Sequence, residues 1–193
     1  MDGLAGGMGP GPITGGEVTG GQVTGGEVAA LREPRLRDLR FAGQLALWSL
    51  RQGLRLIMGE AEARARLLDA LTVSEAPRAL LPLETFLRVV AAGAGRPVEM
   101  RNPCAATLGR DEALMLRALA ACQAGDEALA RGLLETLLEP SAARAGAAAL
   151  CQWADVFSLA GLRLADRSCG RLSALDHLFA QSPLNHAGLA RLH

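Results

Sequence analysis

One stretch of the chain is apolar nearly all the way round a helix. Over Glu112–Gln123 the only polar side chains after the first residue are one arginine and the final glutamine. A helix of this kind is usually buried on most sides. Asp111 or Gly109 can cap its start, and Gly125 can adopt the left-handed turn that follows its end. The pattern therefore predicts a central helix on which the other helices pack.

Apolar residues spaced three or four apart predict helices along most of the remaining chain. In the segment 127–138 this spacing places Leu129 on the inward side, and in the segment 142–160 it places Trp153 at the edge of the buried side. The predicted fold is all-α, a single irregular or orthogonal bundle of about six to seven helices. Besides the central helix, the segments expected to be helical are 36–58, 60–71, 82–92, 127–138, 142–160, 172–180 and 183–192.

Two segments break the helical pattern. Residues 1–33 are rich in glycine and contain three tandem pentads that begin at Thr14, Thr19 and Thr24, so we expect a disordered low-complexity tail before a helical domain at 34–193. Removing the tail should then leave the melting temperature unchanged. Residues 96–109 contain two prolines, which favour extended backbone before them, so a loop with a short strand or extended arm is expected there. Loops often carry function.

Composition removes several classes of chemistry. All twenty basic residues are arginines, and tyrosine is absent, so a lysine Schiff base, a P-loop lysine and a phenolic acid or base are excluded. Exclusive use of arginine is typical of a GC-rich genome of bacterial type. The formal net charge is zero, which gives no electrostatic indication of a nucleic-acid or membrane partner. We expect no catalytic residues and no cofactor.

The four cysteines and three histidines offer only weak candidate sites. Cys104, Cys122, Cys151 and Cys169 could meet around zinc, but no Cys-x-x-Cys pair is present, so we expect free thiols and no metal. His177 follows Asp176, yet adjacent helical residues do not face each other, so a nucleophilic triad is not favoured. The chain begins without a signal-peptide pattern, and we expect a cytoplasmic protein.

The remaining candidate is an arginine face on the predicted first helix, opposite its apolar residues. It could bind phosphates, anionic lipid or an acidic partner, but a solvated face with ordinary helix charges is the favoured explanation. If the face is only solvated, replacing Arg51 and Arg55 together should not change stability. Its members are Arg37, Arg40, Trp48, Arg51 and Arg55.

These observations favour a non-catalytic adaptor or regulator that acts through protein contacts. A protein partner is expected, its identity cannot be inferred from the sequence, and a homo-oligomer stays open. Binding of nucleic acid or of a membrane surface through the arginine face is the first alternative. An enzyme with an unrecognised site is the second.

Overall fold

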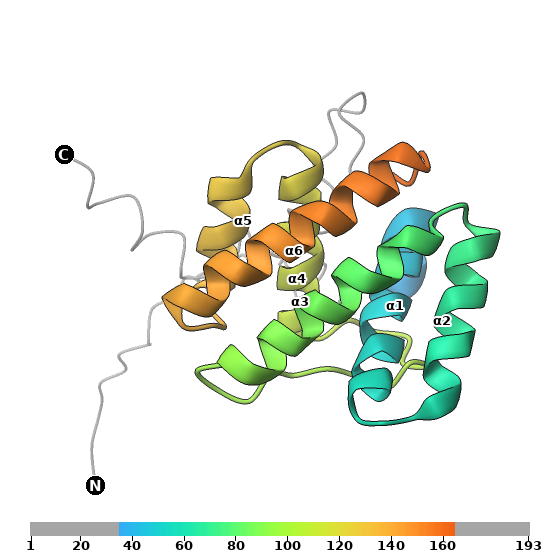
Figure 1. The fold of residues 1–193 in the computed structure, drawn as a ribbon, viewed down its shortest axis with the longest axis horizontal. Helices are drawn as coiled ribbons and strands as arrows, with labels where there is room; N and C mark the ends of the chain where they lie inside the picture. Colours follow the sequence, from blue (N-terminus) through green and yellow to red (C-terminus); the bar gives the residue numbers. More distant parts are fainter. Residues whose placement is uncertain (1–34, 165–193) are drawn as a thin grey trace, which may run out of the picture. The chain divides into compact units, whose positions relative to one another are not determined.

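The computed structural model describes residues 35–164, and this part of the chain is an all-α bundle, which confirms the predicted fold class (Figure 1). The predictions for residues 1–33, 172–180 and 183–192 lie outside the described residues, as do Cys169 and all three histidines. The described elements are η2 (Leu36–Asp38), α1 (Phe41–Ile57), α2 (Ala61–Val73), η3 (Pro77–Ala79), α3 (Leu80–Gly93), α4 (Arg110–Gln123), α5 (Glu127–Leu134) and α6 (Pro140–Leu159).

Short turns join α1 to α2 and α4 to α5, and each of these two pairs packs together. Gly59, with φ +92°, lies in the turn from α1 to α2, and Gly125, with φ +80°, lies in the turn from α4 to α5. A left-handed residue after a helix strongly favours glycine, as predicted at Gly125. The Asp126 side chain then accepts a hydrogen bond from the Leu129 N–H at 2.9 Å and caps α5. None of the described helices is long and apolar enough to cross a bilayer.

Helices α3 and α6 pack closely side by side in antiparallel directions (Figure 1). The Glu139 N–H donates to the Gly93 carbonyl at 3.0 Å, which holds the start of α6 against the end of α3. A Cβ atom at Gly93 would overlap the Cβ of Ala142, so glycine permits this close approach. Farther along, α6 contacts η3, which immediately precedes α3.

The core is built mainly from leucine and alanine, and α4 lies inside it as predicted. Met115, Leu116 and Leu119 on α4 are completely buried, and α4 packs against α1, α5 and α6. Trp153 of α6 is also completely buried and packs edge-on against Phe157, with ring centroids 5.4 Å apart. The expectation that Trp153 lies at the edge was wrong, because α6 is covered by helices on more than one side.

Two predicted helices differ from the observed ones by more than two residues at one end. The first begins at Phe41 and not at residue 36, because the Leu36 N–H donates to the Ala106 carbonyl at 2.8 Å and draws the preceding residues onto the irregular segment. The helix α5 ends at Leu134, four residues early, and Leu129 is 41% exposed. Its buried side consists of Ala130 and Leu134, one helical turn apart, which leaves Leu129 facing solvent.

The irregular segment, residues 96–109, crosses the bundle without forming a strand. Within residues 35–164, β-type pairing is limited to two isolated bridges, Arg35 with Thr107 and Ala94 with Leu138. The expected short strand at this segment is therefore absent, and the extended-arm alternative describes it better. Because so few backbone groups of the segment pair with one another, its position depends on side chains from the helices.

Candidate functional site

The predicted arginine face does not form one surface. Arg37 and Arg40 precede α1 and are exposed, whereas Trp48 and Arg55, near the end of the helix, are half-buried. Arg51, in contrast, is 1% exposed. Its placement on the solvated side was wrong, because it follows Leu47 by four residues and shares that buried side of α1.

Two arginines of the face, Arg37 and Arg55, form ion pairs with carboxylates close by in the sequence. Arg55 donates from Nε to Glu60 Oε1 at 2.9 Å, and this hydrogen bond raises the pKa of the guanidinium. Arg37 lies 3.9 Å from the Asp38 carboxylate. Both pairs are local and solvent-exposed, so their charges are partly neutralised on the protein surface itself.

Arg51 holds the irregular segment against the start of α4. Its Nε donates to Glu112 Oε1 at 2.7 Å and its Nη2 to Glu112 Oε2 at 2.8 Å, a two-pronged pair. The same guanidinium donates to the backbone carbonyls of Ala105 and Thr107, each at 2.8 Å. One buried side chain of α1 thereby fixes two points of the segment and one residue of α4.

Glu112 completes this network from the other side. Its carboxylate accepts hydrogen bonds from the backbone N–H groups of Gly109 and Arg101, each at 2.8 Å. Gly109 is the residue before α4, so Glu112 closes the first turn of its own helix. Burial alone would raise its pKa, but the Arg51 charge and these hydrogen bonds outweigh burial and lower it.

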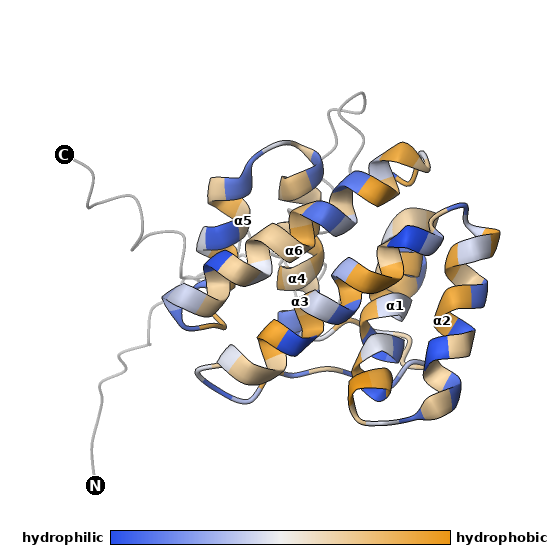
Figure 2. Ribbon diagram, in the orientation of Figure 1, coloured by the Kyte–Doolittle hydropathy of each residue, from blue (hydrophilic) through white to orange (hydrophobic). Residues whose placement is uncertain are grey.

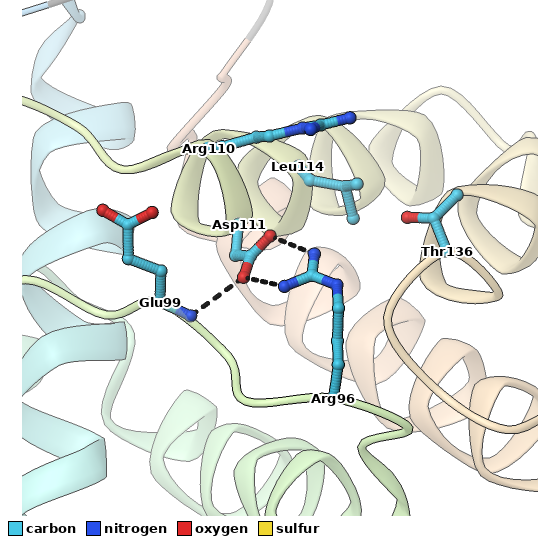
Figure 3. Close-up of a pocket in the computed structure, with 6 residues that line it drawn as sticks. All are labelled: Arg96, Glu99, Arg110, Asp111, Leu114 and Thr136. Carbon is cyan, nitrogen blue, oxygen red and sulfur yellow. Dashed lines mark hydrogen bonds and ion pairs between the residues drawn. The ribbon is translucent and has the colours of Figure 1, made fainter. Parts of the chain in front are cut away.

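Asp111, the neighbour of Glu112, makes a parallel contact with the start of the segment (Figure 3). Arg96 donates to its two oxygens at 2.6 and 2.9 Å, and the Glu99 N–H donates at 2.8 Å. Desolvation opposes the charged form of Asp111, yet these donors and the Arg96 charge hold its pKa below the usual value. The hydrogen bond to Asp111 raises the pKa of Arg96 in turn.

A cavity of about 590 Å³ opens over this second pair. Figure 3 shows the Arg96 guanidinium directed at Asp111, whereas the Glu99 carboxylate points away from it and only the Glu99 backbone faces the pair. Both Asp111 oxygens accept hydrogen bonds and its lowered pKa favours the ionised form, so Asp111 is not poised as a proton donor at neutral pH. The residues that line the cavity are Arg96, Glu99, Arg110, Asp111, Leu114 and Thr136.

A second, smaller cavity of about 260 Å³ lies beneath the irregular segment and is mostly apolar. Arg96 lines both cavities, and Val98 and Met100 of the segment cover α1, α3 and α4 side chains. The side chains from those helices include Leu54, Val90 and Met115. This arrangement resembles incomplete core packing more than a polar active site, since Arg96 supplies the only charged group among its lining residues.

Of the described cysteines, Cys122 and Cys151 lie within hydrogen-bonding reach of each other, whereas Cys104 lies on another segment. Cys122 is buried in α4 and Cys151 is half-buried in α6, and desolvation is the main cause that raises the pKa of both thiols. Cys104 is exposed on the irregular segment. Among residues 35–164, no three side chains of the metal-binding types gather as a potential ion site.

Three of the most exposed large apolar side chains lie at one end of the bundle, which we call the apolar end. They are Val73 at the end of α2, Leu81 at the start of α3 and Leu159 at the end of α6, with exposed fractions of 86%, 72% and 90%. The antiparallel pairing of α3 and α6 and the contact of α6 with η3 bring these helix ends together (Figure 1). In Figure 2 the last turns of α2 and α6 are orange at this end.

Fold and site together define an all-α domain whose buried charges serve its architecture. Comparison of this chain with protein-family models, curated proteins and solved structures finds no match. Its function must therefore be argued from its own residues.

Sequence reasoning identified the irregular segment as a candidate but missed the side chains that hold it. It treated Asp111 as a possible cap of the central helix, which accounts for its position and not for its partners. One readable signal was Arg51 itself, an arginine four residues after Leu47 on an apolar side. The apolar end left no such signal, because Val73 and Leu81 fit the apolar spacing as well as buried residues do.

Proposed function

We propose that this helical domain is a non-catalytic, cytoplasmic adaptor or regulator of bacterial type that binds a protein partner through the apolar end. The observation that supports this proposal most directly is the exposure of Val73, Leu81 and Leu159 on helix ends that lie together. Solvent-exposed apolar side chains on neighbouring helix ends favour a contact with another macromolecular surface. None of the three belongs to the buried Arg51–Glu112 network, which lies in the interior.

The state of the carboxylates also supports a binding function over catalysis. Asp111 and Glu112 each accept three or more hydrogen bonds and have lowered pKa values, so their charge is committed to holding the irregular segment. A catalytic acid or base requires a proton that it can exchange near neutral pH. The burial of Arg51 removes one charge from the face on which nucleic-acid or membrane binding was considered.

The test is affinity capture from the native host with the full chain, with and without nuclease digestion. We expect the parent chain to retain a partner protein after nuclease digestion. A variant that combines Val73→Ser, Leu81→Ser and Leu159→Ser should no longer retain it. Met58→Ser is the matched control. Met58 is 75% exposed and follows the last residue of α1, away from the end of α2 that carries Val73, so this variant should retain the partner. Equal capture by the triple variant, or retention that disappears on digestion, would contradict the proposal.

A further inference from the structure

The apolar end lies where the described chain stops. Leu159, the most exposed of its three residues, ends α6, and the last described residue is Leu164, five positions later. Between them the chain turns at Gly161, and the Gln123 side chain holds it by donating to the Leu162 carbonyl at 2.7 Å and accepting from the Leu164 N–H at 3.0 Å. Twenty-nine residues, 165–193, follow this anchored point.

Those following residues include a short run with its own apolar stripe. Leucine and phenylalanine recur at helical spacing over 172–180, at Leu172, Leu175, Leu178 and Phe179. The spacing predicts a short helix, and a helix of this length is marginal alone in water unless it packs on an apolar surface. From Leu164 to residue 172 the chain can span up to about 27 Å, which is enough to turn back across several helix ends.

We propose that residues 172–180 dock on the apolar end within the same chain and compete there with the protein partner. An apolar surface lies near the chain's exit point, and an apolar stripe is tethered eight residues beyond it. Tethering gives a weak contact an effective concentration of about millimolar, so a short segment can cover the surface and still be displaced. The competition, though not the docking, rests on the proposed function.

Site-specific photo-crosslinking of the purified full chain tests the docking without any partner. A benzophenone amino acid is placed at residue 73 or 81, both more than ninety positions before the segment, and at residue 58 as the control. We expect crosslinked peptides that join residues 73 and 81 to 172–180, and none from residue 58. Mixing isotopically labelled and unlabelled protein separates crosslinks within one chain from those between two copies.

A full chain with Leu175→Ser and Phe179→Ser provides the second arm. It should lose the crosslinks and capture several-fold more partner in the affinity assay. Crosslinks only between copies, or none to 172–180, would overturn the inference while leaving the proposed function intact. If crosslinks form within the chain but neither the parent nor the variant captures a partner, the proposed function and the competition would both be contradicted. The docking would then stand as intramolecular packing alone.

Discussion

At the scale of single residues, two adjacent carboxylates determine how the irregular segment lies. Asp111 and Glu112 are consecutive and therefore point to different sides of α4, so each reaches a different part of the segment. Asp111 binds its start through Arg96 and Glu99, and Glu112 binds its middle and end through Arg51 and backbone N–H groups. Sequence spacing could place the two carboxylates at a helix start, but their partners come from distant positions, which local patterns do not encode.

The lowered pKa values make stability sensitive to acid. Asp111 and Glu112 bind protons more weakly in the folded chain than at their usual values of 3.8 and 4.5, so the unfolded chain takes up protons first as pH falls. Their contribution is fully present above about pH 5 and is lost as pH falls through the lower folded pKa values. Urea unfolding between about pH 7 and pH 3 should show this loss.

Asp111→Asn is the control for that acid dependence. The variant should be less stable than the parent at neutral pH and should show a shallower decline on acidification, because one titrating group has been removed. A parent whose unfolding free energy stays constant down to about pH 3 would contradict the assignment of lowered pKa values.

At the scale of helices, the apolar pattern predicted type and burial better than it predicted ends. It identified α4 as the buried helix because its apolar residues surround the axis, and Leu119 is completely buried. It failed at Leu129 and Trp153, since the apolar spacing of one helix does not reveal how many neighbours cover it. It also extended the first helix through Leu36, where a hydrogen bond to Ala106 prevails over local propensity.

Leu119→Ala should destabilise the domain by about 2–5 kcal/mol, because it removes buried methyl groups and leaves a cavity. Leu129→Ala is the matched change on α5, where the side chain is 41% exposed, and it should cost under about 1 kcal/mol. Urea unfolding of both variants checks the order. Similar losses would mean that α4 is not the centre of the core.

A pair of glycines tests the contact between α3 and α6. Gly93→Ala should destabilise by about 1–3 kcal/mol, because its Cβ would overlap Ala142 on the facing helix. Gly132→Ala on α5 has open space around the new Cβ and should stabilise by about 0.4–1 kcal/mol. The thermal midpoints of the two variants should therefore move in opposite directions, and a Gly93→Ala midpoint at or above the parent's would refute the close approach.

At the scale of the whole described domain, the buried Arg51–Glu112 pair joins segments that are 61 residues apart in the sequence. It connects α1 to α4 and fixes the irregular segment between them. The earlier expectation that replacing Arg51 and Arg55 leaves stability unchanged therefore no longer holds for Arg51. Composition and periodicity could predict an all-α core, but not this connection, because a buried charge looks like a surface charge in the sequence.

The most direct test of this structural account is urea unfolding of Arg51→Met, Glu112→Leu and the double variant, with Arg55→Met, which removes a solvent-exposed pair, as the control. Each single change should cost about 3–5 kcal/mol, since it leaves a buried charge without its partner. The double variant should remain destabilised by several kcal/mol, because the backbone groups of residues 101, 105, 107 and 109 also lose their partners. Arg55→Met should change stability by under about 0.5 kcal/mol. A double variant as stable as the parent would contradict the claim that this pair holds the irregular segment in place.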